Sequence, residues 1–284
     1  MATLLILKRR MKTASNVSKT TKAMQMIAAS KLKKAQDGAE SSKPYVEKLD
    51  YLSKALEQRV DKENFHQYMI PHEDINAKLL IVISPDKGLC GGLVTNLIRE
   101  ILHYSNAGKT YYITIGKKAE RAVASLNKEV VASFPFGTTL PQFEMVFPIA
   151  KIVDEYFLGK KVSEVTILST KFTSVFSQVP ELNTLLPVKL AEKAEAGKST
   201  TLFEPNVDAL LPALLQHYLE MVIYQSLLES YASEQAARMI AMKNATDNAL
   251  DIISELRLEY NKTRQEKITN ELLDITGGSQ IAYE

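Results

Sequence analysis

The chain has 284 residues, of which 45% are hydrophobic and 24% charged, values typical of a soluble protein with one or two domains. Its single cysteine excludes a disulfide framework within the chain. Its longest apolar runs are much shorter than the roughly 18 residues of a membrane span, so the sequence predicts no transmembrane helix.

The net charge of +2 conceals a strong asymmetry along the chain. Residues 1–43 contain ten Lys or Arg and two acidic residues, whereas residues 207–284 contain six and twelve. Residues 44–206 are balanced, with 19 of each sign. A basic and an acidic helix would complement each other along a shared interface, although each exposed ion pair contributes little stability.

The N-terminal segment has the apolar spacing of a coiled-coil strand, with a mean period of 3.5 residues. The predicted seam consists of Leu7, Met11, Ala14, Val17 or Ser18, Thr21, Met24, Ala28, Leu32 and Ala35. Pro44 is expected to interrupt this helix, and residues 45–60 read as a further helix. We therefore assign residues 1–60 to a first, helical region and residues 61–77 to a polar linker.

Two other readings of the basic N-terminal segment compete with the coiled coil. A start rich in Arg, Lys, Ser and Thr resembles a mitochondrial transit peptide. A basic helix also binds nucleic acid or a membrane surface. The seam persists for about eight turns, which is longer than targeting requires and favours the coiled coil.

Residues 78–205 alternate between short apolar strands and amphipathic helices. Such alternation predicts a parallel, Rossmann-like sheet. The predicted strands are residues 79–84, 111–115, 130–134 and 165–169, with 173–179 as an additional edge strand, and the predicted helices are 93–101, 117–126 and 145–158.

The C-terminal region, residues 206–284, is dominated by 64 residues without Gly or Pro, from 213 to 276. A continuous helix of this length would measure roughly 96 Å, so it needs a partner helix. Gly277 and Gly278 are expected to end it. Its predicted seam consists of Met239, Met242, Thr246, Ala249, Ile253, Leu256, Tyr260 and Thr263.

Beyond Thr263 the seam register meets polar residues, and the apolar positions shift to Ile268, Leu272 and Ile275. This shift predicts that the helix leaves its partner and meets a different surface. The sequence therefore predicts an α/β protein. It combines a long antiparallel coiled coil of the N- and C-terminal helices with a Rossmann-like domain inserted between them.

Several short segments imitate active sites without completing one. Residues 88–92 form a Gly-rich turn but lack the dinucleotide-binding spacing, and Cys90 within it reads as a structural thiol. Residues 108–110 and 197–199 end like a phosphate-binding loop but lack its first glycine. The four histidines show no metal-ligand spacing, and Glu234–Arg238 reads as an ordinary helix-surface pair. These observations favour a mechanical or scaffolding protein.

Five motifs resemble the gamma subunit of F-type ATP synthase. They lie in the family's order, and the resemblance covers essentially the whole chain. The motifs are residues 22–31 (KAMQMIAASK), 86–93 (DKGLCGGL), 233–239 (SEQAARM), 260–265 (YNKTRQ) and 268–271 (ITNE). The start at Met1 resembles the bacterial form and argues against a transit peptide.

The resemblance implies a central rotor shaft that couples proton flow through the membrane c-subunit ring to ATP synthesis or hydrolysis and regulates ATPase activity. It implies contacts with the alpha3-beta3 hexamer, the epsilon subunit and the c ring, with the delta subunit in the same complex. The Mg-nucleotide sites would belong to beta and alpha, and this chain would bind no cofactor, metal or nucleic acid and carry no catalytic residue. The expected location is the cytoplasmic face of the bacterial inner membrane, with the membrane contacted only through the c ring.

The same resemblance implies which residues couple the shaft to its partners. Arg264, Gln265, Thr269 and Glu271 match positions that hydrogen-bond to beta or support the shaft near it. A further set, Arg238 together with Lys22 and Met24, matches positions that support coupling. Without the resemblance, each would read as a solvated helix face.

The chain departs from the family pattern in three places. Thr20 and Thr21 make the segment before residue 22 more polar, Ser279 follows the glycine pair, and residues 4–7 carry less charge than is usual. A coiled-coil adaptor or nucleic-acid-binding scaffold is the alternative function, and a Rossmann enzyme that uses Cys90 is a third. The direction of physiological work, the coupling ion and the mode of epsilon regulation stay open.

Overall fold

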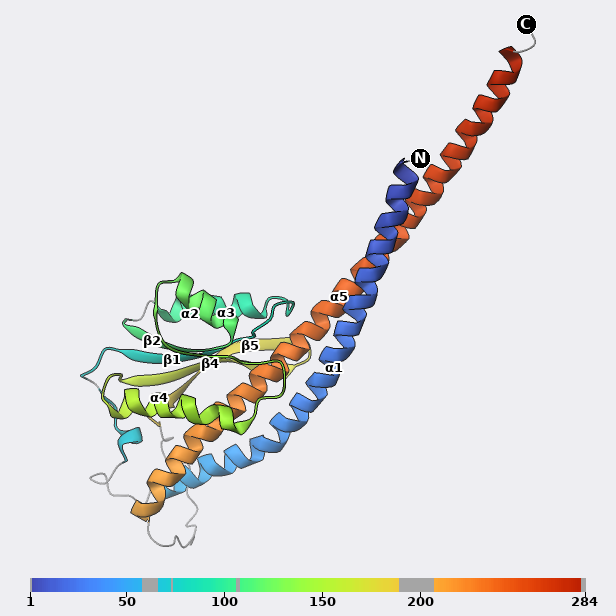
Figure 1. Cartoon of the computed structure of the whole chain (residues 1–284). Helices are drawn as coiled ribbons and strands as arrows, with labels where there is room; N and C mark the ends of the chain where they lie inside the picture. The colour runs from blue at the N-terminus through green and yellow to red at the C-terminus, as the bar shows by residue number, and fades with distance from the viewer. Residues whose placement is uncertain (1, 58–65, 73, 106–107, 189–206, 282–284) are drawn as a thin grey trace. The chain divides into compact units, whose positions relative to one another are not determined.

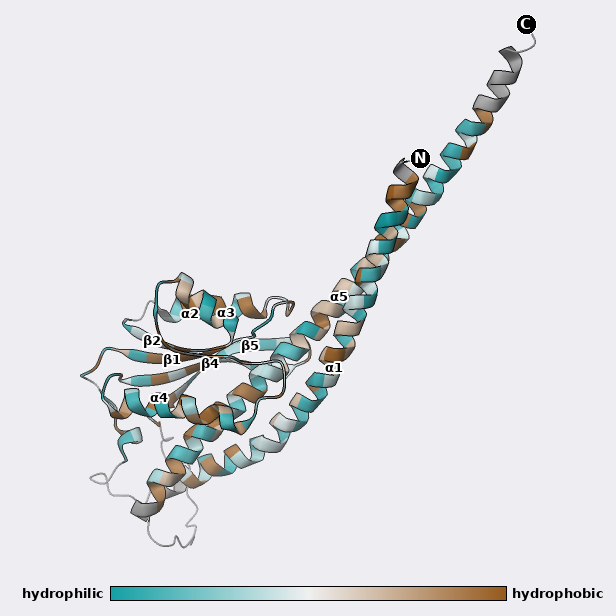
Figure 2. Cartoon of the chain, viewed as in Figure 1, coloured by the Kyte–Doolittle hydropathy of each residue, from teal (hydrophilic) through white to brown (hydrophobic). Residues whose placement is uncertain are grey.

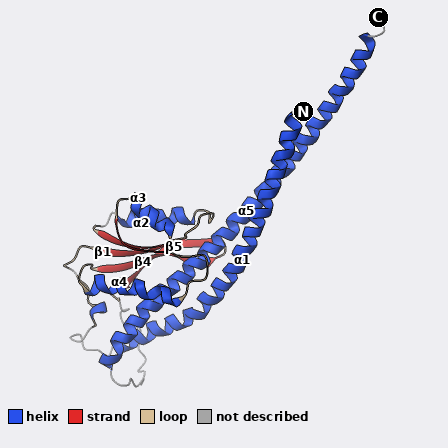
Figure 3. Ribbon diagram, viewed as in Figure 1, coloured by secondary structure: helices blue, strands red, loops and turns tan. Residues whose placement is uncertain are grey.

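The computed structural model describes residues 2–57, 66–72, 74–105, 108–188 and 207–281. The chain divides into an α/β unit (residues 28–238) and a coiled-coil unit (residues 1–27 and 239–284). Its elements, drawn in Figures 1 and 3, are α1 (Ala2–Glu57), η2 (Gln67–Met69), β1 (Lys78–Ile83), α2 (Leu93–Ser105), β2 (Thr110–Ile115), α3 (Lys117–Ser125), β3 (Glu129–Phe134), η3 (Phe143–Met145), α4 (Val146–Leu158), β4 (Glu164–Ser174), β5 (Ser177–Leu186) and α5 (Val207–Ile281).

The α/β unit is built on a five-stranded sheet in the order β3-β2-β1-β4-β5. The first four strands run parallel, with Ile81 of β1 opposite Ile113 of β2 and Ile167 of β4, and β5 is antiparallel to β4. Helices α2 and α3 cover one face of the sheet and α4 covers the other (Figure 1). This double cover explains why residues 79–83 of β1 are fully buried, since a parallel strand is apolar on both faces.

The four predicted parallel strands and an additional edge strand are confirmed, but the predicted bounds of the edge strand, residues 173–179, are wrong. Strand β4 continues to Ser174, and β5 starts at Ser177 and runs back antiparallel. The hydroxyl of Ser174 accepts the backbone N–H groups of Phe176 and Ser177, so its side chain closes the turn between the strands. The turn contains Val175 and Phe176 and no Gly or Pro, so the sequence carries no strong turn signal at this point.

Pro44 does not interrupt the first helix, contrary to the sequence prediction. It lies inside α1, and within the α/β unit this part of the helix packs beside α5. The Ser42 hydroxyl bonds the Gln225 amide, Gln225 Nε2 donates to the carbonyl of Ala39, and the Tyr45 hydroxyl lies 2.9 Å from Nε2 of His217. These contacts on both sides of Pro44 maintain the helix even though the proline lacks an N–H donor.

In the coiled-coil unit, all eight predicted seam positions of α5 are buried or half-buried. Met242, Thr246 and Ala249 are the most buried of them, at 5–6% exposed. The hydroxyl oxygens of Thr21 and Thr246 lie 2.7 Å apart and join the two helices directly. Small residues at this level allow the helix backbones to approach closely.

The seam of α1 takes the second of the two predicted alternatives at Val17 or Ser18 and differs from the prediction at Met24. Ser18 is buried while Val17 is 46% exposed, and Gln25 is half-buried while Met24 is 40% exposed. Steps that alternate strictly between three and four residues from Leu7 lead to Ser18 and Gln25, and one residue of error turns a side chain by about 100°. The prediction chose Met24 over Gln25 because methionine is the more hydrophobic of the two.

The last part of α5 continues past the N-terminal end of α1 (Figure 1). Here Ile268 is 48% exposed, Leu272 58% and Leu273 62%, so the predicted departure of the helix from its partner is confirmed for these residues. The side chain of Ile275 lies outside the described residues. The predicted stop at Gly277 is wrong, because α5 runs through both glycines to Ile281; glycine weakens a helix without preventing it.

Candidate functional site

The predicted partner-contact residues at the tip of α5 are all exposed. Arg264, Gln265, Thr269 and Glu271 lie on one helix, where the Thr269 hydroxyl donates to the carbonyl of Gln265 at 3.0 Å. Glu271 forms an ion pair of 3.3 Å with Lys267, which contributes little stability at such exposure. Arg264, Ile268 and Leu272 follow one another at four-residue spacing and therefore share a face. The tip thus presents a mixed surface of charged, amide and apolar groups, visible as alternating colours in Figure 2.

On α1 of the coiled-coil unit, the predicted contact residues Lys22 and Met24 are also exposed. Met26 and Ile27 beside them are 61% and 57% exposed. Met24, Met26 and Ile27 are therefore three exposed large apolar side chains within four residues of α1, outside its coiled-coil seam. Such an exposed apolar group on a helix is the kind of surface that a protein partner covers.

Arg238, in the α/β unit, is not a surface residue. Its side chain is 16% exposed and forms a 2.7 Å ion pair with Glu234, whose side chain is 5% exposed. The prediction that Glu234–Arg238 is an ordinary solvated pair is therefore wrong. The four-residue spacing identified the pair correctly, but the burial comes from the turn after β1, whose carbonyls contact Arg238.

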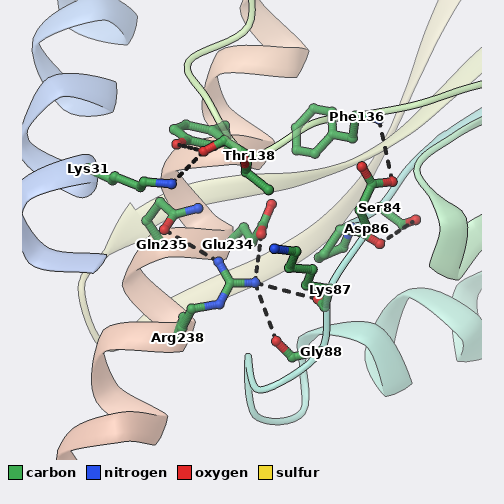
Figure 4. A network of polar contacts seen from close by, with 12 residues as sticks. Lys31, Ser84, Asp86, Lys87, Gly88, Phe136, Thr138, Glu234, Gln235 and Arg238 are labelled. Carbon is green, nitrogen blue, oxygen red and sulfur yellow. Dashed lines mark hydrogen bonds and ion pairs between the residues drawn. The ribbon is translucent and has the colours of Figure 1, made fainter. Parts of the chain in front are cut away.

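Arg238 links α5 to the turn that follows β1 (Figure 4). Its Nη2 donates to the carbonyls of Gly88 at 3.3 Å and Lys87 at 3.5 Å, and its Nη1 donates to the Gln235 amide at 3.4 Å. Burial raises the pKa of Glu234, and the charge of Arg238 opposes that shift. The forked guanidinium can satisfy a carboxylate and two carbonyls at once, which a lysine ammonium in the same place would do less well.

The turn itself is held by Asp86, a residue to which the sequence analysis gave no role. Its carboxylate accepts the backbone N–H groups of Lys117 at 2.9 Å and Gly137 at 2.8 Å, and a longer bond from Phe136 at 3.5 Å. Lys117 is the first residue of α3, so the carboxylate occupies the anion position at that helix N-terminus. Nothing in the local sequence signals this, because the three donors lie 31 to 51 residues away.

Cys90 lies in the same turn and is 2% exposed, packed in the core between the sheet and α2. Burial raises the pKa of its thiol, which disfavours the reactive thiolate. Among the described residues, no group of three or more His, Cys, Asp or Glu side chains is placed to hold a metal ion. None of the helices in the described ranges is long and apolar enough to cross a membrane.

Comparison with known proteins identifies the family. A family model described as ATP synthase matches residues 3–281. A protein of Dehalococcoides mccartyi (strain BAV1) described as ATP synthase gamma chain is 38% identical over 281 residues, which cover 98% of this chain and 99% of the relative. The chain belongs to the ATP synthase gamma-chain family. The gamma chain of Thiobacillus denitrificans, at 36% identity with 95% and 96% covered, agrees.

Solved structures agree with this assignment. A chain of the Tetrahymena thermophila mitochondrial ATP synthase central stalk and c ring has 26% identity and a TM-score of 0.60, with 80% of this chain and 99% of that chain covered. A chain of the Euglena gracilis mitochondrial enzyme has the same fold, with a TM-score of 0.71 at 18% identity and with 99% and 95% covered. As a gamma chain of ATP synthase the protein is its rotor shaft, and the alternative of an adaptor or nucleic-acid-binding scaffold finds no support.

Proposed function

We propose that this gamma chain transmits torque in a bacterial, proton-translocating ATP synthase without a catalytic site of its own. In this proposal its coiled-coil unit enters the alpha3-beta3 hexamer, and its α/β unit meets the epsilon subunit and the c ring. Mg-ATP and Mg-ADP bind to beta and alpha, and the delta subunit belongs to the same complex. The chain then sits peripherally at the cytoplasmic face of the inner membrane, held there through the c ring.

The observation that carries the proposal is the exposed end of α5. Helix α5 extends beyond the start of α1 as a single helix with apolar side chains in solvent. A shaft without threefold symmetry cannot contact three beta subunits alike, so each beta is biased toward a different conformation and nucleotide affinity. Rotation of the shaft moves these biases around the ring.

We assign the partner contacts to the exposed residues of the coiled-coil unit. On α5 these are Arg264, Gln265, Thr269 and Glu271, all of which are exposed. On α1 they are Lys22 and Met24, which support the shaft against the hexamer. Arg238 supports coupling from within the chain, because its side chain is occupied by Glu234 and the turn after β1.

The test is reconstitution of the chain with the other subunits of a matching bacterial enzyme in membrane vesicles, followed by measurement of ATPase activity and of ATP-driven proton pumping. We expect a stable, active assembly with the full chain. Removal of the residues from Arg264 onward should leave the complex assembled and abolish coupled activity. A chain that fails to assemble with well-folded partners, or a truncated shaft that couples as well as the full one, would contradict the proposal.

A further inference from the structure

One loop of the α/β unit contacts both long helices at a single atom. The loop between β3 and η3, residues 135–142, which we call the β3–η3 loop, carries the backbone carbonyl of Thr138. This carbonyl accepts a bond of 2.5 Å from Nζ of Lys31 in α1 and one of 3.1 Å from the hydroxyl of Tyr231 in α5. Figure 4 shows Lys31 reaching from its helix to Thr138. One acceptor therefore joins two helices through donors 200 residues apart in sequence.

The loop cannot follow the helices freely, because Asp86 fixes its start to the sheet. The N–H of Gly137, one residue before Thr138, donates to Asp86 at 2.8 Å, and the N–H of Phe136 lies 3.5 Å from the same carboxylate. The carboxylate also accepts the first N–H of α3, at Lys117. The Thr138 carbonyl is thus presented to the helices from a rigid support.

Further contacts fix the loop against each helix separately. The Phe136 ring, 2% exposed, meets the Tyr231 ring edge-on with centroids 6.2 Å apart. The hydroxyl of Tyr224, which lies about two helical turns before Tyr231 in α5, donates to the carbonyl of Pro141 at 3.4 Å. On α1, the side chain of Leu140 lies over Gly38, where an added Cβ would sit 3.7 Å from it. The loop is packed on α5 and α1 at more than one turn.

The lysine also acts on the buried ion pair. Burial raises the pKa of Glu234, and the charge of Arg238 and, to a smaller extent, that of Lys31 oppose this shift. The neighbouring lysines of α1, Lys33 and Lys34, are exposed. Of these three lysines, Lys31 is the one whose ammonium donates to the β3–η3 loop in the described part of the chain.

We propose that Lys31 and Tyr231 are positioning residues of the rotor, which hold α1 and α5 at a fixed rotation about each other by sharing the Thr138 carbonyl. Around this level the seam of α1 consists of Ala28, Leu32 and Ala35, all at most 4% exposed, and such apolar packing is not directional. Hydrogen bonds are directional, so the shared carbonyl resists the sliding that torque would produce. The inference rests on the proposed function as a torque-transmitting shaft.

The experiment compares variants in the assembled, membrane-reconstituted complex. Lys31→Met and Tyr231→Phe each remove one donor with little change of shape, and Lys33→Met is the matched control on the same helix. Two quantities are measured: the hydrogen exchange rates of the Phe136 and Gly137 amides, and the protons pumped per ATP hydrolysed.

Each single variant should raise amide exchange in the β3–η3 loop by roughly threefold to tenfold, the effect of one lost hydrogen bond. The double variant should lower the ratio of pumping to hydrolysis by about twofold or more, with a non-additive effect because both donors share one acceptor. Lys31→Arg, which keeps a cationic donor, should recover most of the ratio, and Lys33→Met should leave both quantities unchanged.

Three outcomes would overturn the inference. Unchanged exchange in the double variant would show that the shared carbonyl does not hold the loop. Faster amide exchange with an unchanged ratio of protons pumped to ATP hydrolysed would show that the two residues have a purely structural role. A lower yield of complexes that pump normally would show the same. A wild-type complex that hydrolyses ATP without pumping would instead refute the proposed function itself, so the two failures are distinguishable.

Discussion

At the scale of single residues, burial changes what a common sequence pattern means. Glu234 and Arg238 have the spacing of a surface pair, yet their side chains are 5% and 16% exposed. One carboxylate oxygen, Oε1, contacts the guanidinium, and the other, Oε2, is buried with no hydrogen-bond partner among the described residues. The carboxylate therefore depends on the charges of Arg238 and Lys31 for compensation.

Arg238→Met should accordingly destabilise the chain by about 3–5 kcal/mol, because it leaves a buried carboxylate without its main partner. The double variant Glu234→Gln with Arg238→Met should lose less, since it removes the uncompensated charge as well. Urea unfolding of the purified chain measures both. The exposed Arg257 provides the control, and Arg257→Met should change the free energy of unfolding by less than about 0.5 kcal/mol.

The same pair predicts a pH dependence. Burial raises the pKa of Glu234 above its ordinary 4.5, so the folded state binds this proton more tightly than the unfolded state. The contribution of this group to stability therefore falls as the pH rises above the ordinary value. Arg238→Met should steepen the fall, because it removes an opposing charge, and Glu234→Gln should abolish this contribution. A variant Arg238→Met with the same pH profile as the wild type would argue against the assignment.

At the scale of elements, the register of the coiled coil follows geometry rather than hydrophobicity. Gln25 faces the seam and its Oε1 is buried without a hydrogen-bond partner among the described residues, whereas the more apolar Met24 is exposed. The alternation of three- and four-residue steps decides which side chain faces the partner helix, because two helices can share only one seam. The polar Gln25 in the seam lowers the stability of the coiled coil, and the side chain of Met24 is left exposed.

Gln25→Leu should stabilise the coiled-coil unit by about 1 kcal/mol, since it replaces an unsatisfied buried amide with an apolar side chain of similar size. Met24→Leu, one residue away, should change the free energy of unfolding by less than about 0.5 kcal/mol. Thermal unfolding followed by helical circular dichroism tests the pair of variants. If Gln25→Leu does not stabilise the unit, the assignment of Gln25 to the seam is contradicted. A large effect of Met24→Leu alone would place Met24 in the seam instead.

At the scale of the whole molecule, the proposed torque transmission depends on residues that the folded chain leaves exposed. The tip of α5 keeps Arg264 and Gln265 in solvent beside an exposed Ile268. Because exposed polar residues contribute little to folding, their replacement separates partner contact from stability. The double variant Arg264→Ala with Gln265→Ala should therefore weaken the rotor without unfolding it.

In the reconstituted enzyme, we expect this double variant to lower ATP-driven proton pumping while the unfolding midpoint of the isolated chain is preserved. Glu255 and Arg257, exposed earlier on the same helix, allow a matched double alanine control. Pumping at the wild-type rate would refute a contact role for Arg264 and Gln265. A lowered midpoint would instead attribute the loss to folding.

The sequence by itself determined the features that repeat locally. All eight seam positions of α5 followed from a 3.5-residue period, and the four parallel strands from short apolar runs, because backbone periodicity dictates which side chains share a face. The five family motifs supplied the rotor role. Where two neighbours competed for the seam, as Val17 and Ser18 did, local hydrophobicity gave no unique answer.

Only the tertiary structure decided the contacts between distant segments. The continuation of α1 through Pro44 depends on α5 packed beside it, and the burial of Arg238 depends on the turn after β1. Lys31 and Tyr231 lie 107 and 93 residues from Thr138, so no local pattern links them. Such contacts arise only when the completed fold brings a fixed carbonyl within reach of both helices.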